Sequence, residues 1–367
     1  ELAKKKKVDV IIIDHHQSEI KLPVAHSIVN PNRFDDKSEL NYLCAAGVCF
    51  MFLVALNKRL RDNNWFLNNS IKEPDLMSLL DLVSLGTVCD VVPLIGINRA
   101  FVRQGLRVLK KKKNLGLKTL IEVCNIEKPI TAHELGYILG PRINAGGRVG
   151  KSTDGANLLL NQNPKNTFKL AVDLNIYNEE RKVLETELLN KILNIDYKNS
   201  TDPVIILYGE NWHEGIIGII AARVKDKYNK PTIIISVKDG VGKGSGRSMY
   251  GFDLGSVIIG AVQNNLLSKG GGHKMAAGFT IEMDKIHEFK EFVFRKYKSV
   301  NINLEEKKNY YYDIEIAPSA VNINFFEKIN LLAPFGAGNL EPRFIIKDLK
   351  LVNSKIVGEK HIKIVLL

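Results

Sequence analysis

Apolar positions in the first half of the chain form one short continuous run and then several helical patterns. Residues 8–13 (VDVIII) make a β-branched run of the kind found in a buried parallel strand. Apolar side chains then recur at helical spacing over residues 43–60, 74–85 and 100–109. Because a strand followed by helices is typical of α/β domains, the pattern predicts that fold class.

The second half begins with a long helical pattern, and a strand–helix–strand alternation follows it. Residues 168–192 carry apolar side chains at helical spacing without Gly or Pro, which predicts a long helix joining two domains. Residues 204–208 and 231–237 are predicted strands with an amphipathic helix over 216–224 between them, and a glycine-rich turn is expected next. The polar residues 301–308 are a predicted linker.

Two apolar segments close the chain. Residues 343–352 and 361–367 are predicted to pair as strands of a small β domain. The chain starts without Met at Glu1 and stops inside the second of these strand-like runs. We therefore expect it to be a piece of a longer protein, cut at both ends.

Composition narrows the class of protein. Hydrophobic residues make up 45% and charged residues 25%, as in soluble globular proteins, and no run approaches the ~18 apolar residues that a membrane span needs. The 52 Lys and Arg against 40 Asp and Glu give a net charge of +12, which favours a polyanionic partner. The four cysteines contain no C-x-x-C pair. They indicate buried thiols in a reducing cytoplasm rather than a zinc site or disulfides.

Carboxylates and imidazoles suggest a metal site in the first half. Asp14, His15 and His16 directly follow the first apolar run, and ligands bind at the carboxyl ends of strands in open α/β sheets. Such a trio suits Mn²⁺ or another borderline divalent ion, although strand-end residues hydrogen-bonded to loops are an equal alternative. Asp90 stands among Val, Cys and Leu, where burying a carboxylate is costly without a cation or hydrogen bonds. A metal ligand is the favoured interpretation of Asp90, and a helix-capping or turn aspartate is the alternative.

Three glycine-containing segments suit phosphate binding. GPRINAGGR places Arg142 and Arg148 in a predicted stiff loop, and arginine forks suit phosphate oxygens, although surface salt bridging is the commoner use. GKGSGRS places Ser245 and Arg247 in a predicted turn whose N–H groups can approach an anion, a plain flexible hairpin being the alternative. In GGGHKMAAG, His273 is placed to hydrogen-bond a phosphate or a base.

Two function classes are excluded by what these motifs lack. The Gly–Lys pair of GKGSGRS has neither the earlier glycine nor the following Ser/Thr of a Walker loop. His133 and His213 each precede a Glu as in zinc proteases, but Tyr137 and Ile217 stand where the second histidine is required.

Taken in order, these motifs resemble the RecJ-type exonucleases of the DHH phosphoesterase superfamily. Asp-His-His after a strand is the motif that names the superfamily, and GTVCDVVP resembles its fourth motif. GPRINAGGR, NWHEGIIGIIAARV and GKGSGRS resemble successive RecJ signatures, and GGGHKMAAG resembles the DHHA1 domain shared by many DHH enzymes. LLAPFGAGNLEPRF resembles the segment that leads into the OB-like domain of RecJ, so the resemblance spans the chain.

The resemblance implies an α/β protein of four parts. These are a DHH domain with a parallel sheet and without its N-terminal motifs (1–165), a connecting helix (166–200), a DHHA1 α/β domain (201–300), and an incomplete OB-like nucleic-acid-binding β domain (301–367). The family's first two motifs, an Asp-x-Asp pair and a further aspartate, should precede the first strand. None of the thirteen residues before Asp14 matches them, so we expect this piece by itself to bind metal poorly and to be inactive.

The implied activity is metal-dependent hydrolysis of single-stranded DNA from its 5′ end, in repair and recombination in the cytoplasm. Two Mn²⁺ or Mg²⁺ ions would activate a water and stabilise the leaving oxygen. By this resemblance Asp14, His15, His16 and Asp90 are the catalytic residues. His15 and Asp90 are direct metal ligands. Asp14 also belongs to the metal site, and Asp14 and His16 orient this site or contact the scissile phosphate.

The same resemblance implies residues for DNA binding and further partners. Ser245 and Arg247 help to bind the 5′ end, Arg142 or Arg148 grips the strand nearby, and His273 contributes from the DHHA1 domain. The OB-like domain adds contacts through a basic groove and stacking aromatic residues. The implied partners are single-stranded DNA, single-strand-binding protein and a helicase. The implied protein is a monomer that does not bind a membrane.

Two other functions stay open. Small DHH phosphodiesterases that act on short oligonucleotides or dinucleotides share the GGGH-type DHHA1 domain, but they generally lack the segment that follows Asn301 here. A non-catalytic single-strand-binding scaffold is the second alternative. The intact Asp14, His15, His16 and Asp90 argue against it.

Overall fold

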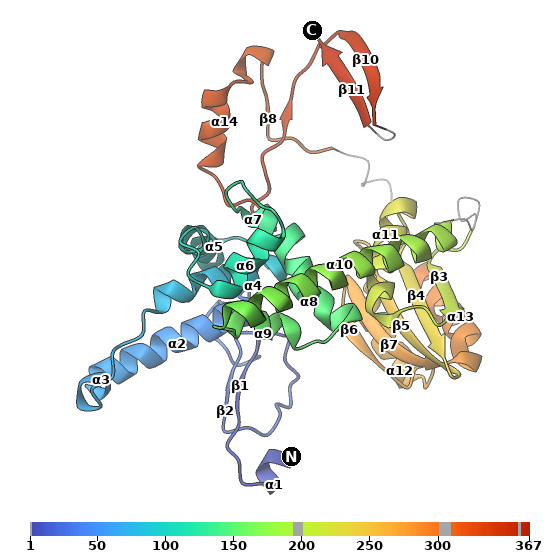
Figure 1. The fold of residues 1–367 in the computed structure, drawn as a ribbon. Helices are drawn as coiled ribbons and strands as arrows, with labels where there is room; N and C mark the ends of the chain where they lie inside the picture. Colours follow the sequence, from blue (N-terminus) through green and yellow to red (C-terminus); the bar gives the residue numbers. More distant parts are fainter. Residues whose placement is uncertain (1, 194–200, 301–309, 359–360) are drawn as a thin grey trace. The chain divides into compact units, whose positions relative to one another are not determined.

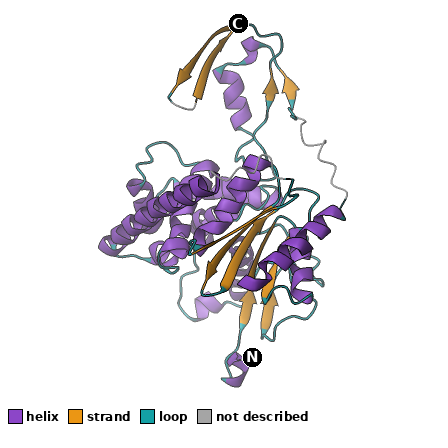
Figure 2. Cartoon of the chain, turned by 90° about the vertical axis from the view of Figure 1, so that its right-hand side faces the viewer, coloured by secondary structure: helices purple, strands orange, loops and turns teal. Residues whose placement is uncertain are grey.

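A computed structural model describes residues 2–193, 201–300, 310–358 and 361–367, so the predicted linker over 301–308 lies outside the described residues. The chain divides into two compact units. The first contains Glu1–Ile121, Asn125–Gly140 and Asn309–Leu367, and the second contains Glu122–Cys124 and Pro141–Lys308. Figures 1 and 2 show helices and strands in both, as the predicted α/β class requires.

The first unit begins with a short helix, α1 (Leu2–Lys5), and a parallel pair of strands. β1 (Ile11–Ile13) pairs with β2 (Ser27–Val29) in parallel. The strand predicted over residues 8–13 therefore forms only in its last three residues. Because the two strands are parallel, their carboxyl ends meet at one edge, where Asp14 follows β1 and Asn30 follows β2.

Helices form most of the rest of this unit, and the three predicted helical segments are confirmed. The helices are α2 (Ala45–Asp62), α3 (Trp65–Asn68), α4 (Leu80–Cys89), α5 (Gly96–Leu109), α6 (Leu115–Val123) and α7 (Ala132–Glu134). α4 and α5 pack closely because Gly105 has no side chain: a Cβ there would lie 2.2 Å from the Leu80 carbonyl oxygen. Leu80, Phe50 and Phe101 belong to the core that these helices enclose.

The buried carboxylate of Glu134 helps to cap the N-terminus of α7 (Ala132–Glu134). Thr131 and Glu134 form a capping box, in which Glu134 Oε2 accepts from the Thr131 N–H at 2.8 Å and from its hydroxyl at 2.7 Å. Lys128 Nζ lies 2.9 Å from Glu134 Oε1. Burial alone would raise the pKa of Glu134, but the hydrogen bonds from Thr131 and Lys128 outweigh burial and lower the pKa to about 2. The folded state therefore prefers the ionised carboxylate.

Replacing Glu134 by Gln is expected to lower the free energy of unfolding by roughly 2 kcal/mol at pH 7. Because the pKa is lower in the folded state, this stabilisation is present above about pH 4.5 and is lost as the pH falls towards about 2. Urea unfolding at several pH values should therefore show the two proteins converging in acid. Glu127→Gln, at an exposed neighbouring position, is the control. A difference that does not change with pH would contradict the assignment.

The segment after α7 is helical, so the prediction of a stiff loop at GPRINAGGR was wrong. A π-helical turn, η2 (Leu135–Leu139), leads directly into α8 (Gly140–Val149). Pro141 directly follows the π-helical turn as the second residue of α8, where the hydrogen-bond pattern changes from π-helical to α-helical. The glycines serve close packing: a Cβ on Gly140 would lie 2.4 Å from Cys89 Sγ, and one on Gly146 would lie 2.7 Å from the Lys151 carbonyl oxygen.

The C-terminal residues of the first unit form small strand pairs and one helix, α14 (Ile323–Asn330). β8 (Ile314–Glu315) pairs in parallel with β9 (Phe344–Ile345). β10 (Leu351–Val357) pairs antiparallel with β11 (His361–Leu366). The final strand is confirmed as β11. Its predicted partner over 343–352 began too early, because the strand that pairs with β11 is Leu351–Val357, whereas residues 344–345 pair with β8.

The second unit contains a five-stranded mixed sheet in the order β3-β4-β5-β7-β6. The strands are β3 (Ile205–Glu210), β4 (Thr232–Lys238), β5 (Val241–Arg247), β6 (Lys269–His273) and β7 (Ala276–Glu282). Its α-helices are α8, which enters this unit at Pro141, and α9 (Asp154–Leu160), α10 (Pro164–Leu193), α11 (Glu214–Tyr228), α12 (Leu254–Gln263) and α13 (Ile286–Lys298). The long helix predicted over 168–192 is α10, drawn in green in Figure 1.

Helices cover both faces of this sheet. α11 packs on β4 and β5, and its apolar side chains join those of α10 in one core. α12 packs on β6 and β7, and together with α13 it encloses a second core around Phe252 and Phe289. The predicted strands over 204–208 and 231–237 and the helix between them are confirmed as β3, β4 and α11.

The predicted glycine-rich turn at GKGSGRS was wrong, because this segment is β5, an interior strand of the sheet. Gly242, Gly244 and Gly246 alternate with Lys243, Ser245 and Arg247, and only the glycines are buried. A Cβ on Gly244 would lie 2.1 Å from the ring of Phe279. The glycines therefore make room for the core, and the period-2 alternation is the sequence signal of a strand.

All four cysteines are free thiols in the structure. Only Cys44 is buried, whereas Cys49 and Cys124 are half-buried and Cys89 is exposed, so the prediction of buried thiols holds for Cys44 alone. Among the described residues, no helix has the length and apolar character needed to cross a membrane.

Candidate functional site

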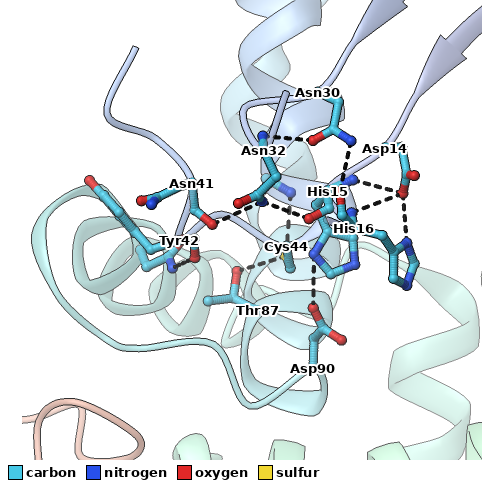
Figure 3. Close-up of polar contacts among 12 residues, drawn as sticks. Asp14, His15, His16, Asn30, Asn32, Asn41, Tyr42, Cys44, Thr87 and Asp90 are labelled. Carbon is cyan, nitrogen blue, oxygen red and sulfur yellow. Dashed lines mark hydrogen bonds and ion pairs between the residues drawn. The ribbon is translucent and has the colours of Figure 1, made fainter. Parts of the chain in front are cut away.

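Asp14, His15 and His16 occupy the turn that follows β1 (Figure 3). Asp14 Oδ1 accepts from the backbone N–H of His15 at 2.7 Å and of His16 at 3.3 Å, and it lies 2.7 Å from Nδ1 of the His16 ring. Because an ionised carboxylate can only accept, the His16 ring donates from Nδ1 in this contact. Asp14 therefore fixes both the turn and the orientation of His16.

The protonation state of Asp14 follows from these contacts. Burial alone would raise the pKa of Asp14, but the hydrogen bonds from the His16 ring and from the two backbone N–H groups outweigh it and lower the pKa. Asp14 is thus an anion at neutral pH. A negative oxygen in this turn favours the approach of a cation.

Two asparagines that the sequence analysis missed hold this turn from the end of β2. Asn30 Nδ2 donates to the His16 carbonyl oxygen at 2.9 Å, and Asn32 Nδ2 donates to that of His15 at 2.7 Å. The Asn32 N–H donates in turn to Asn30 Oδ1 at 2.8 Å. The available signal was the apolar run before Asn30, which marks a second strand whose carboxyl end adjoins that of β1.

Asp90 approaches the turn from α4, where it is the C-terminal capping residue. Its Oδ2 lies 3.5 Å from Nδ1 of His15, and its side chain is 42% exposed (Figure 3). Asp90 is therefore not the buried carboxylate that its apolar neighbours predicted, since the end of the helix presents it to solvent. Val91 ends the helix with φ of 57°, which is a strained conformation for a β-branched residue.

The residues at this point fit a divalent metal ion in part. One imidazole and one carboxylate converge from segments 75 positions apart, and imidazole with carboxylate is a donor set suited to Mn²⁺. Within the part of the chain that the structure describes, no group of three or more His, Cys, Asp or Glu side chains is arranged to hold a metal ion. His15 and Asp90 are therefore an incomplete set of ligands.

The second unit gathers arginines beside Ser245. Arg247 Nη1 lies 3.3 Å from Ser245 Oγ, and both side chains point to the face of β5 that α11 covers. Gly218 of α11 leaves the space for them: a Cβ there would lie 2.9 Å from Ser245 Oγ and 3.1 Å from Arg247 Nη2. The first glycines of α11 thus decide how closely this helix approaches the pair.

Arg148 joins the same group from α8. Its Nη1 donates to the Gly215 carbonyl oxygen at 2.8 Å, and a Cβ on Gly215 would lie 2.4 Å from the Arg148 carbonyl oxygen. Burial lowers the pKa of Arg148 and of Arg247, and the positive charges of Arg181 and of Arg148, respectively, lower each further. An anion bound beside them would relieve this repulsion.

The charge of Glu185 acts in the opposite direction and raises the pKa of Arg148, but Glu185 is itself paired with other arginines. Glu185 accepts from Arg181 at 3.0 Å and from Arg223 at 3.1 Å. Among the described residues, no carboxylate lies within ion-pair distance of Arg148 or Arg247. Arg148, Arg247 and Ser245 form a group of hydrogen-bond donors whose chemistry suits a phosphate.

The other two predicted DNA-binding residues are placed differently. Arg142 donates from Nε to Asn175 Oδ1 at 2.8 Å, and its Nη2 lies 3.8 Å from Glu179, so its guanidinium contacts α10. His273 is exposed at the end of the edge strand β6. Ala276 pairs with both Arg247 and His273, which puts those two residues on one face of the sheet, two strands apart.

The chain is similar to known proteins over almost its whole length. Profiles of three domain families match it: the DHH family N-terminal domain over residues 1–87, the DHHA1 domain over 201–299 and the RecJ OB domain over 312–367. The single-stranded-DNA-specific exonuclease RecJ of Dickeya dadantii is 34% identical in an alignment of 373 positions that covers 99% of this chain and 64% of that protein. RecJ of Escherichia coli is 35% identical in an alignment of 370 positions that covers 97% of this chain and 63% of that protein.

Two solved structures resemble this fold. Thermus thermophilus RecJ in complex with Mn²⁺ has a TM-score of 0.84 at 29% identity, and the match covers 99% of this chain and 52% of that one. An exonuclease RecJ bound to manganese has a TM-score of 0.64 at 30% identity, and the match covers 81% of this chain and 72% of that one. The chain thus spans less than two thirds of the length of the two curated relatives.

Proposed function

Because this chain belongs to the RecJ family, we propose that the full-length protein hydrolyses single-stranded DNA from its 5′ end with Mn²⁺ or Mg²⁺. The observation that carries the proposal is the approach of His15 to Asp90, whose nearest atoms are 3.5 Å apart. Relatives of this chain are single-stranded-DNA-specific exonucleases, and two solved relatives are RecJ proteins with bound manganese.

His15 and Asp90 would hold a metal ion directly in this proposal. A divalent ion bound there supplies positive charge that lowers the pKa of a water and stabilises charge on the scissile phosphate. Asp14, through its hydrogen bonds to His16, keeps that ring in one orientation and one tautomer. His16, whose side chain is 78% exposed, is placed to contact a phosphate oxygen of the substrate. The remaining ligands are expected from the family's first two acidic motifs.

The 5′ end is assigned to the second unit. Ser245 Oγ, the Arg247 fork and Arg148 would bind the terminal phosphate, because they form a group of donors in which neither arginine has an ion pair with a described carboxylate. His273 on the same face of the sheet would contact the next nucleotide. Arg142, which already contacts Asn175, would act by holding α8 against α10 rather than by touching DNA.

Similarity to the RecJ family is also the basis for proposing the domain division, the oligomeric state, the biological role and the protein partners. We propose the four-part division into 1–165, 166–200, 201–300 and 301–367, a monomeric state, and a role in repair and recombination in the cytoplasm. Single-strand-binding protein and a helicase are the proposed protein partners. The three matched domain families lie within the first, third and fourth of these parts.

The test is an end-label assay on the purified full-length protein. A 40-nucleotide strand labelled at its 5′ end should release labelled mononucleotide at once with Mn²⁺, whereas a 3′ label should appear first in progressively shorter strands. Chelation with EDTA should stop both, and a blunt duplex should resist. Hydrolysis confined to oligonucleotides of a few residues would indicate a small phosphodiesterase instead. Binding without hydrolysis at any metal concentration would indicate a scaffold.

A further inference from the structure

Positive charge is concentrated in one segment outside the residues assigned so far. Residues 91–121 contain eight Lys and Arg and no Asp or Glu, which equals two thirds of the net charge of +12. The eight are Arg99, Arg103, Arg107, Lys110, Lys111, Lys112, Lys113 and Lys118. This segment contains α5 and most of α6, so the charge is carried by defined structure.

Three of these residues lie on one face of α5, and Lys111 lies in the turn that follows the helix. Arg99, Arg103, Arg107 and Lys111 follow one another every fourth position, and such residues lie above one another on a helix. Phe101, Val102, Gly105, Val108 and Leu109 are buried on the opposite side. At 1.5 Å per residue the three arginines span about 12 Å of α5, and Lys111 lies in the turn after the helix. These four residues are hereafter the α5 basic stripe.

The stripe is not neutralised within the described part of the chain. Arg103, Arg107 and Lys111 are exposed and form no ion pair there; Arg107 reaches only Gln104, at 3.4 Å. Arg99 donates to the Leu332 carbonyl oxygen at 2.6 Å. Like charges four positions apart destabilise a helix by a few tenths of a kcal/mol per pair. The arrangement is therefore unfavourable unless an external anion compensates it.

The α5 basic stripe begins in the helix that follows the candidate metal residue Asp90 along the chain. α4 and α5 form an antiparallel pair: Gly105 in α5 faces Leu80 at the start of α4, and Asn98 donates to the Pro93 carbonyl oxygen at 3.0 Å near its end. Asp90 is the C-terminal capping residue of α4, and Arg99 lies in the first turn of α5. Asp90 and the stripe therefore belong to the same unit, and the stripe begins nine positions after Asp90.

We propose that the α5 basic stripe binds the sugar-phosphate backbone of the single strand beyond the nucleotide being hydrolysed. This inference rests on the proposed function. Arginine forks and lysine amines bind phosphates of any sequence, and the stripe offers no aromatic side chain to read a base. Apolar side chains are absent from the row itself, which favours a nucleic acid over a membrane surface.

The test is the salt dependence of single-strand binding by the full-length protein, measured in EDTA with a fluorescent 30-nucleotide strand. Arg103→Gln, Arg107→Gln and Lys111→Gln are combined in one variant. Each lost phosphate contact on a single strand lowers the slope of log K against log salt by about 0.7, so the triple variant should lose about 2. The far-ultraviolet circular dichroism spectrum of the triple variant should match that of wild type, which separates lost phosphate contacts from a lost fold.

A matched control removes the same charge from another helix of the same unit and its neighbouring loop. Lys58, Arg59 and Lys72 are exposed, and each is replaced by Gln. The control should keep the wild-type slope. An unchanged slope in the stripe variant, or an equal loss in the control, would overturn the inference and leave only a general effect of net charge. Failure of wild type to hydrolyse any strand would instead overturn the proposed function, while the binding comparison still reports on the stripe.

Discussion

Replacing His15 by Ala, or Asp90 by Asn, in the full-length protein is expected to lower the rate of single-strand hydrolysis at least about a thousandfold. The two side chains approach to 3.5 Å and are the residues proposed to hold a metal ion. Transition-state stabilisation by such an ion amounts to several kcal/mol, and each 1.36 kcal/mol corresponds to a factor of ten in rate. The measurement is single-turnover release of mononucleotide at saturating Mn²⁺.

Binding distinguishes a lost metal site from a lost fold. Both variants should bind single-stranded DNA in EDTA within about threefold of wild type, because the arginines beside Ser245 lie in the other unit. Manganese binding, followed by calorimetry, should weaken in both. Asp62→Asn, at an exposed position at the end of α2, should leave both activity and metal binding unchanged. Exonuclease activity that persists in the His15 and Asp90 variants would remove these residues from the site.

Replacing Arg247 by Ala is expected to slow hydrolysis of 5′-phosphorylated strands by about 10- to 100-fold and that of 5′-hydroxyl strands by less than about threefold. A hydrogen bond between charged groups contributes about 1.5–3 kcal/mol, and only the phosphorylated end offers it. Arg247→Lys should recover part of the loss, because it keeps the charge but not the fork. The measurement is kcat/KM on two strands that differ only at the 5′ end.

Two further variants test the geometry of this group. Gly218→Ala removes no charge, yet its Cβ would lie 2.9 Å from Ser245 Oγ, so an intermediate loss confined to 5′-phosphorylated strands is expected. Arg223, which pairs with Glu185 and is 63% exposed, is the matched arginine, and Arg223→Ala should leave the preference for a phosphate unchanged. Equal losses on both kinds of strand in the Arg247 variant would rule out its role at the 5′ phosphate.

Local sequence patterns predicted individual elements better than they predicted how glycine-rich segments fold. The helices α2, α5, α10 and α11 follow from apolar spacing, because a helix buries one stripe of side chains whatever its partner is. GPRINAGGR and GKGSGRS were misjudged as loop and turn because glycine lowers the local preference for a helix or a strand. In both segments contacts decide: Cys89 requires Gly140, and Phe279 requires Gly244.

The sequence by itself determined the α/β class, the order of the motifs and the chemistry of each: carboxylate and imidazole after one strand, arginines and hydroxyls later. Only the tertiary structure decided which of these side chains meet. His15 meets Asp90 because α4 ends beside the turn after β1, and Arg148 meets Arg247 because α8 packs against the start of α11. Such meetings depend on where helices end and how closely glycines let them approach. These are properties of packing between distant segments, which no local pattern contains.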